Sequence, residues 1–380
     1  MGGDDAAHAG GRRPRRGGGG AGRVPRGLIP VPELPEVETV ARDLGRLIVG
    51  ATISGARVSW PRSVRTPTAD LLGSALASVG RRAKLVVMNL AGGAVLTIHL
   101  KMTGQLFVVP ADLPEDPYVR VVLELADGRE IRFRDIRKFG RVGLYERDGT
   151  PFAAFGPEPL EPAFTLAAFR RLIRRRKGRL KPLLVDQAFL AGVGNIYADE
   201  ALWAARLHPL RSASSLRPAD ERRLFAELRR VLAEAVERRG SSIDDYTAPD
   251  GDGSMQERLQ VYQRTGEACP RCGRPVRRIV IGARASHFCS WCQRLPARDR
   301  AGATAILRGM VPKLGASAAR DGRLSRRGGR WADLAGDGAL GLTPDEAARV
   351  VARERAERTR RAAATRRAAA RASARATAGG

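Results

Sequence analysis

Apolar and polar positions change their spacing along the chain, and each change predicts a different kind of element. From Leu34 to Leu47 the apolar side chains recur every three to four residues, which predicts one amphipathic helix. Helical spacing returns later and continues to about Arg239. Between these regions lie short β-rich or alternating runs that predict strands, at residues 52–58, 84–90, 94–100, 105–109, 118–125, 130–134 and 141–145.

Turn signals connect these runs into hairpins. Ala91-Gly92-Gly93 and Ala126-Asp127-Gly128 each separate two predicted strands. Repeated antiparallel hairpins with one leading helix favour a β-sandwich over a parallel sheet, and the helices that follow make the chain α+β. The proline-rich residues 156–162 predict a domain boundary.

One glycine-rich segment interrupts the helical region, and a second follows it. Gly192-Val193-Gly194-Asn195 separates the apolar-periodic residues 180–190 from residues 196–207, which predicts two short helices meeting at a tight turn with exposed backbone. Residues 240–254 are rich in Gly, Ser and Asp and predict a mobile loop.

Charge indicates the partner. The chain has 380 residues, a net charge of +27 and no apolar run that spans a bilayer, so we expect a cytoplasmic protein that binds nucleic acid rather than a membrane. Residues 1–31 carry +4 and residues 295–380 carry +11, which leaves +12 on the central region. Both terminal extensions are rich in Gly, Ala and Arg. Disorder is predicted for the first, and one helix opening at Thr343 is predicted in the second.

Four cysteines form two close pairs. Cys269 and Cys272 are separated by two residues, and Cys289 and Cys292 repeat that spacing. This pattern is typical of a tetrahedral zinc site on two knuckles, the alternative being reduced buried thiols. Four sulfur ligands leave the metal no open position, so we predict one structural Zn²⁺ that folds a hairpin.

Pro32 and Glu33 stand just before the first predicted helix. If Pro32 began the chain, its secondary amine could attack a sugar C1′ and form an iminium, and Glu33 could transfer protons. The structural alternative is a proline at the first helical position with acids in the first turn. These residues alone do not decide between the two.

Six motifs in one order decide the interpretation: residues 32–40, Arg81-Arg82-Ala83-Lys84, His99-Leu100-Lys101-Met102-Thr103-Gly104, Asp135-Ile136-Arg137-Lys138-Phe139-Gly140, Gly192 to Tyr197, and the four-cysteine finger. Together they resemble the bacterial formamidopyrimidine-DNA glycosylase family over residues 32–294. The resemblance implies a base-excision repair enzyme that removes oxidised purines and then nicks the strand by β,δ-elimination.

The resemblance also implies roles for single residues. Pro32 matches the Schiff-base nucleophile and Glu33 the acid that assists ring opening and base departure. Lys84 matches the general acid/base of β-elimination, and Arg284 the finger residue of δ-elimination. The matched DNA contacts are a wedge of Met102, Arg137 and Phe139, and phosphate contacts at Lys181 and Asn195, with Arg176, Lys177 and Tyr118 as further candidates. Glu36 and Glu200 also match family positions, and we expect them to orient backbone or the nucleophile rather than to transfer protons.

The implied domains follow the family's order. They are an extension at 1–31 that is disordered or misassigned, a catalytic β-sandwich domain at 32–160, a helix-two-turns-helix domain at 161–259, a zinc-finger β-hairpin at 260–294 and a basic extension at 295–380. We expect a monomer that acts on double-stranded DNA containing oxidised bases or abasic sites, in the cytoplasm at the nucleoid.

This sequence departs from the family pattern at two positions and at its start. Tyr118 stands where many members have a DNA-contacting histidine, and Gln263 where the family usually has Gly. Within a chain, Pro32 is a tertiary amide and not a nucleophile. Val31 occupies the place of the initiator Met and a GTG codon can initiate translation, so we hypothesise a mature chain that begins at Pro32.

Two other functions stay open at this point. A chain that keeps residues 1–31 would be a noncatalytic protein that binds DNA lesions. The sister endonuclease VIII group, directed at oxidised pyrimidines, typically has Gly at the position of Leu34, so Leu34 and residues 37–39 favour the purine-directed branch.

Overall fold

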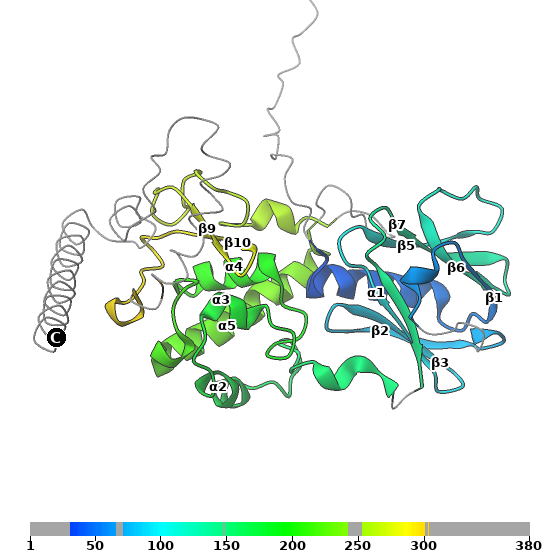
Figure 1. Cartoon of the computed structure of the whole chain (residues 1–380), viewed down its shortest axis with the longest axis horizontal. Coiled ribbons are helices and arrows are strands. Elements are labelled where there is room, and N and C mark those ends of the chain that lie inside the picture. The colour runs from blue at the N-terminus through cyan, green and yellow to red at the C-terminus, as the bar shows by residue number, and fades with distance from the viewer. Residues whose placement is uncertain (1–30, 66–70, 147–148, 242–252, 301–302, 304–380) are drawn as a thin grey trace, which may run out of the picture.

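The computed structural model describes residues 31–65, 71–146, 149–241, 253–300 and 303 (Figure 1). The first thirty residues of the predicted N-terminal extension lie outside the described residues. So do residues 242–252 of the predicted loop and the C-terminal extension after residue 303, including the helix predicted at Thr343.

The first part of the chain is an antiparallel β-sandwich, as predicted. One sheet has the strand order β1-β6-β7-β5, and the other has β2-β3-β4-β8. The strands of the first sheet are β1 (Ile53–Val58), β6 (Val119–Leu125), β7 (Arg129–Asp135) and β5 (Gly104–Pro110). Those of the second are β2 (Leu76–Arg82), β3 (Leu85–Leu90), β4 (Val95–His99) and β8 (Arg141–Tyr145).

The prediction missed β2. Its sequence LASVGRR has a glycine in the middle and two arginines at the end, and only Leu76 in it is buried. The strand is nevertheless paired along its length with β3, from Leu76 with Leu90 to Arg82 with Leu85. Backbone pairing with the apolar β3 therefore decides the conformation of a segment whose own side chains carry little pattern.

Helix α1 (Leu34–Ile48) packs its apolar face, including Val37, Val40 and Leu44, into the core of the sandwich. It begins after Glu33, whose backbone N–H donates to the Glu36 Oε2 at 3.0 Å. Pro32 precedes the helix, and Pro35 lies in its first turn. The structural alternative for Pro32, a first helical position, is therefore wrong.

The second part is helical and has its own apolar core, which includes Phe169, Tyr197 and Leu228. Its helices are α2 (Leu166–Arg174), α3 (Leu180–Leu184), α4 (Asn195–Ala204) and α5 (Pro218–Glu237). Short 3₁₀ turns are η1 (Pro61–Ser63), η4 (Pro151–Ala154), η5 (Ala213–Ser215) and η6 (Met255–Arg258). No helix in the described part of the chain is long and apolar enough to cross a membrane.

The third part is a β-hairpin of β9 (Arg277–Ile281) and β10 (Arg284–Phe288), with β10 packed beside α4. Figure 1 shows α1 between the sandwich and the helices, so the start of α1 lies where the three parts meet. Leu34 N donates to the Gly192 carbonyl at 3.0 Å, which ties that start to the turn before α4.

Candidate active site and metal centre

A cleft of about 760 Å³ opens where the three parts of the fold meet. Its walls come from the start of α1, the β2–β3 and β4–β5 turns, the start of α4 and the β9–β10 hairpin. Among the residues lining it are Val31, Glu33, Lys84, Lys101, Met102, Asn195, Gln263, Arg278 and Arg284. Segments more than two hundred residues apart in the sequence therefore present a carboxyl group, amines and guanidinium groups to one space.

Glu33 lies at the N-terminus of α4. Its carboxylate accepts the backbone N–H of Ile196 at 2.8 Å and that of Tyr197 at 3.3 Å. Burial raises the pKa of Glu33 above its ordinary value, and this effect outweighs the nearby Lys84 and the Ile196 N–H, which lower it. A raised pKa keeps a proton on the carboxyl over a wider pH range, which suits a general acid.

The Lys84 amine and the Glu33 carboxyl approach each other beside Gly194. A Cβ at Gly194 would overlap both the Glu33 carboxyl carbon and the Lys84 Nζ, so only glycine leaves room for these two groups to converge. Burial lowers the pKa of Lys84, and Arg284 adds to that effect, while Glu33 opposes it. Burial thus brings the proton affinities of the carboxyl and the amine closer together, which makes proton exchange easier.

The turn that carries Lys84 is held from outside the cleft. Ala83 has a left-handed backbone (φ +54°), and its N–H donates to the Glu158 Oε1 at 2.6 Å. The same buried carboxylate binds Arg81 at 2.7 Å and Arg82 at 2.8 Å. Sequence reasoning missed Glu158, because a single glutamate in a proline-rich linker carries no local signal of a partner in a distant hairpin.

Glu36 fixes the backbone on the other side of the cleft. Besides the Glu33 N–H, it accepts the Tyr197 hydroxyl at 2.5 Å and the Ser241 N–H at 2.8 Å. Glu200 accepts three backbone N–H groups, at Gln260, Val261 and Tyr262. The predicted backbone-orienting roles of both glutamates are confirmed.

Pro32 is buried directly before Glu33, and Val31, joined to it by a peptide bond, lines the cleft. The Pro32 nitrogen is therefore placed at the edge of the space where Glu33 and Lys84 meet. In this chain that nitrogen is an amide.

The β9–β10 hairpin brings Arg284 to the cleft from its tip, next to Ala283 with φ +64°. Asn195 Nδ2 donates to the Ala285 carbonyl at 2.9 Å, which joins the start of α4 to this hairpin. His287 also meets α4, through its N–H to the Asp199 Oδ2 at 2.8 Å.

Lys181 is placed differently from the prediction. Its Nζ is buried and donates to the Asn195 carbonyl at 2.7 Å and to the Asp199 Oδ1 at 2.6 Å. A direct phosphate contact, as the resemblance implied, is wrong for this placement, because the ammonium is enclosed by protein. Lys181 instead supports the segment that carries Asn195.

The predicted wedge residues lie on two neighbouring turns. Met102 is half-buried in the cleft wall, whereas Arg137 and Phe139 are exposed, with the guanidinium 5.0 Å from the ring centre. Asp135, which opens one of the six motifs but had no role of its own assigned, joins the turns. It accepts the Thr103 hydroxyl at 2.5 Å and the Gly140 N–H at 2.6 Å.

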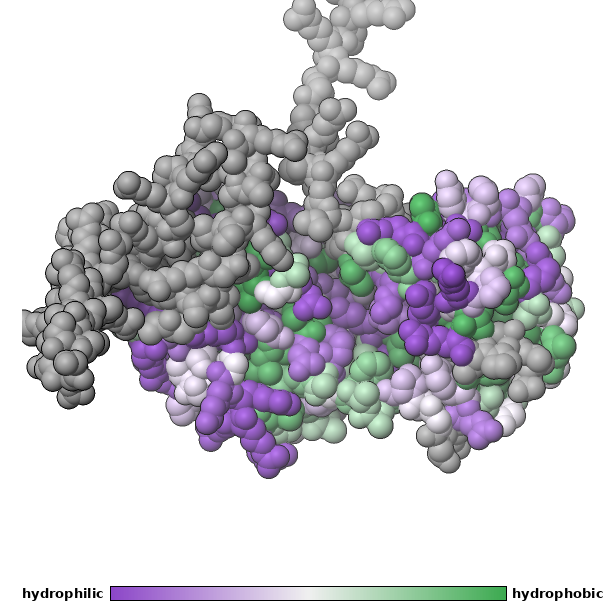
Figure 2. Space-filling view, in the orientation of Figure 1, coloured by the Kyte–Doolittle hydropathy of each residue, from purple (hydrophilic) through white to green (hydrophobic). Residues whose placement is uncertain are grey.

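The remaining predicted DNA contacts lie outside the cleft lining. Tyr118 is exposed, with the Arg134 guanidinium 5.2 Å from its ring centre. Arg176 and Lys177 are exposed just after α2. Hydrophilic residues gather over α2 on the face shown in Figure 2, and Arg171 and Arg174 make the last turn of this helix basic.

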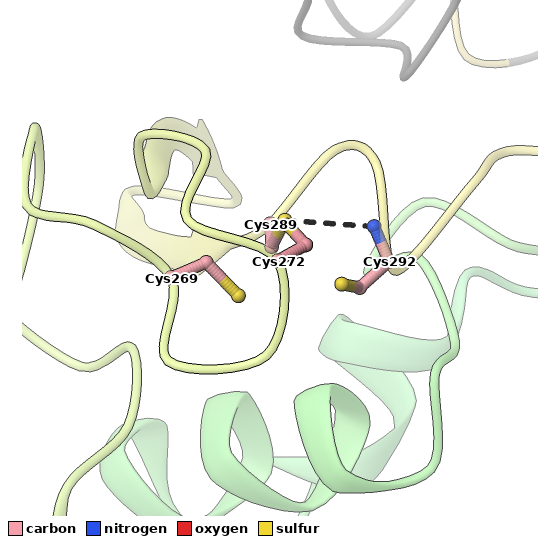
Figure 3. A group of neighbouring side chains, drawn as sticks. All are labelled: Cys269, Cys272, Cys289 and Cys292. Carbon is pink, nitrogen blue, oxygen red and sulfur yellow. Dashed lines mark hydrogen bonds between the residues drawn. The ribbon is translucent and has the colours of Figure 1, made fainter.

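The four cysteines converge at the base of the finger (Figure 3). Their sulfur atoms all lie within 4.8 Å of one another, and the Cys272 and Cys289 sulfurs are 3.4 Å apart. Tetrahedral zinc with Zn–S bonds of about 2.3 Å places its sulfurs about 3.8 Å apart, so this cluster fits one zinc ion. Bound there, the metal would hold the two knuckles together and so fix the hairpin that carries Arg284.

Loss of the metal is expected to unfold the zinc-finger hairpin. Substituting Cys272 by Ala should lower the zinc content from about one ion per chain to near zero and abolish binding to abasic-site duplex, because folding of such a small hairpin depends on the metal. Zinc is measured by mass spectrometry and binding by titration. A C272A chain that holds no zinc but binds DNA like the parent would contradict this dependence.

Three known family models match the three parts of the fold. Residues 31–142 match the N-terminal domain of formamidopyrimidine-DNA glycosylase, residues 155–247 its H2TH domain, and residues 266–295 a zinc finger found in FPG and IleRS. The chain belongs to the formamidopyrimidine-DNA glycosylase family. The predicted family, fold class and zinc finger are confirmed.

Curated relatives agree over nearly their whole length. The formamidopyrimidine-DNA glycosylase of Roseiflexus sp. (strain RS-1) is 46% identical over 273 residues, which cover 70% of this chain and 100% of the relative. That of Herpetosiphon aurantiacus is 46% identical over 272 residues, covering 69% of this chain and 100% of the relative.

Solved structures show the same fold. MutM (Fpg) of Thermus thermophilus is 45% identical with a TM-score of 0.64, and the match covers 69% of this chain and 98% of that one. A Lactococcus lactis Fpg in complex with DNA containing an abasic site is 35% identical with a TM-score of 0.65, covering 69% and 99%. A Lactococcus lactis Fpg mutant in complex with DNA containing Fapy-dG is 37% identical with a TM-score of 0.65, covering 69% and 99%.

Proposed function

We propose that the protein is a bifunctional base-excision repair enzyme that removes oxidised purines, 8-oxoguanine and formamidopyrimidines, from duplex DNA and then cleaves the strand. The observation that carries this proposal is the convergence of Glu33, Lys84 and Arg284 in one cleft, with the Pro32 nitrogen at its edge. Membership of the formamidopyrimidine-DNA glycosylase family supports the same chemistry.

Base removal begins at Pro32 in a chain that starts there. The lone pair of its secondary amine forms a bond to the sugar C1′ as the bond from C1′ to the damaged base breaks, and the base leaves with the bonding electrons and takes up a proton from Glu33. The Glu33 carboxylate then takes the proton that the bonded nitrogen releases and passes it to the ring oxygen, the ring opens, and an iminium joins C1′ to Pro32. Burial raises the pKa of Glu33 and so supports this role.

Strand cleavage uses the iminium as an electron sink. Removal of a C2′ proton sends its electron pair toward the iminium, and the 3′ phosphate leaves; a second elimination releases the 5′ phosphate. We assign the proton transfer of the first elimination to Lys84, whose lowered pKa favours a neutral amine. Arg284 carries a positive charge to the side of the departing phosphate. Water then hydrolyses the iminium and frees Pro32.

DNA binding is assigned to the basic surface around the cleft. Met102, Arg137 and Phe139 fill the space left by an extruded nucleotide, because an apolar plug and a planar guanidinium suit an unstacked step. Asn195, Tyr118, Arg176 and Lys177 are proposed as contacts to the remaining duplex. The protein would act as a monomer, in the cytoplasm at the nucleoid, with catalytic, helical and finger domains at residues 32–160, 161–259 and 260–294.

Lesion choice tests the proposal. The chain that begins at Pro32 is expected to cleave a duplex with 8-oxoguanine opposite cytosine much faster than one with an oxidised pyrimidine, measured as single-turnover strand cleavage. Faster cleavage of the oxidised pyrimidine would move the protein to the endonuclease VIII branch. Tight binding of both duplexes with cleavage of neither would indicate a noncatalytic lesion-binding protein.

A further inference from the structure

Gln263 has a backbone conformation that favours glycine. Its φ is +59°, in the left-handed region, where a side chain crowds the neighbouring backbone. It lies between η6 and β9 and lines the cleft together with Arg278 and Arg284. Glycine, the residue usual at this position in the family that the sequence resembles, would adopt the same turn without strain.

The surroundings hold this turn in place. The backbone N–H groups of Val261 and Tyr262, just before it, both bind the Glu200 Oε1, at 2.9 and 2.8 Å. Tyr262 is buried, and its ring centre lies 5.1 Å from that of His287 on β10. Strain of this kind persists where the structure around it determines the conformation, and it is concentrated at functional sites.

The charge of the cleft wall indicates which kind of ligand the Gln263 side chain contacts. Arg278, Arg284 and Lys101 add positive charge to the cleft wall, which suits an anionic occupant. A carboxamide adds two N–H donors and one acceptor without adding charge. The Gln263 carboxamide can therefore donate a hydrogen bond to a phosphate oxygen of a DNA strand that the neighbouring cations attract.

We propose that Gln263 is a DNA contact, whose carboxamide donates a hydrogen bond to a backbone phosphate of the bound strand in the cleft beside Arg284. The assignment rests on the proposed function, because it takes the occupant of the cleft to be DNA. Glycine at this position has no side chain with which to make the contact.

Two substitutions separate the contact from the strain. Gln263→Gly removes the amide and relaxes the turn, whereas Gln263→Met removes the amide and keeps both the side-chain length and the turn. Each is expected to weaken binding to a duplex with a non-cleavable abasic-site analogue about three- to tenfold, the effect of one hydrogen bond. Without DNA, the melting temperature of the Gln263→Gly variant should be no lower than that of the parent, which separates weaker binding from misfolding.

Salt dependence supplies the second readout. Loss of a neutral donor leaves the slope of log Kd against log salt unchanged, whereas Arg278→Gln should reduce that slope by about one. Weaker binding by both Gln263 variants with the parent's slope supports the contact. Parent-like affinity in either variant, or a slope reduced as in R278Q, overturns it.

The proposed function is tested separately in the same series. If the parent binds the abasic-site analogue and is trapped on a true abasic site while both Gln263 variants match it, only the present inference fails. If the parent itself does not prefer lesion DNA over an intact duplex of the same length, the proposed function fails and the inference fails with it.

Discussion

A chain that begins at Pro32 is expected to form a covalent adduct with abasic-site DNA when borohydride is added, whereas the chain that begins at Met1 is not. Borohydride reduces the iminium that a secondary amine makes with the sugar, and the Pro32 nitrogen is a secondary amine only at a chain start. In the longer chain the nitrogen belongs to the Val31–Pro32 peptide bond and has no nucleophilic lone pair. We expect the rate of adduct formation to differ by at least about a thousandfold.

The matched control is a chain with one glycine placed before Pro32. This chain lacks residues 1–31 but keeps the nitrogen as an amide, so it should be as inactive as the Met1 chain. Duplex binding by the glycine-extended chain should stay close to that of the Pro32 chain, because the contacts of the cleft are unchanged. An adduct formed by a Met1 chain, whose intact mass shows residues 1–31 still attached, would contradict the proposed nucleophile.

The sequence predicted elements whose side chains carry a periodic pattern. Helix α1 was found from its apolar spacing, and its observed bounds, Leu34–Ile48, differ from the prediction by one residue. The hairpin turns at residues 91–93 and 126–128 follow from their glycines, and the zinc cluster follows from cysteine spacing, which depends on local chain geometry. Strand β2 lacks such a pattern, since its conformation is decided by its neighbour β3.

Contacts between distant residues were beyond prediction from residue types. Glu158 and Asp135 each hold a functional turn through a partner far away in the sequence, Ala83 for Glu158 and Thr103 for Asp135. For Lys181, in contrast, the sequence marked the residue but not its partners. The resemblance marked it as functional, and residue type suggested phosphate, but only the fold shows that Asp199 and Asn195 enclose the ammonium. Side-chain burial depends on the whole packed structure, which a local pattern does not contain.

Replacing Glu33 by Gln in the chain that begins at Pro32 is expected to slow removal of 8-oxoguanine by about 10²- to 10⁴-fold, the usual contribution of a positioned general acid. The amide keeps the shape of the carboxyl and can still accept the Ile196 N–H, so the fold should persist. Strand cleavage at a preformed abasic site should fall less, because the base has already left. Single-turnover assays with and without alkali separate the two steps.

Glu38→Gln is the control for charge. Glu38 lies on the same helix, is paired with Arg42 and Arg81, and does not line the cleft, so its substitution removes one negative charge without removing a proton donor. Base removal by E38Q should stay within about threefold of the parent. A comparable loss in both variants would mean that the charge of α1, not proton transfer by Glu33, sets the rate.

The dependence of base removal on pH shows whether Glu33 acts in its protonated form. Burial raises the pKa of Glu33, and the acid acts in its protonated form, so base removal should be fastest below this raised pKa and fall as pH rises through it. In E33Q the carboxyl is gone, and this decline should disappear from the remaining activity. A decline that persisted unchanged would assign the proton to another group. Lys84 is the alternative donor, because it meets the Glu33 carboxyl at Gly194 and burial lowers its pKa.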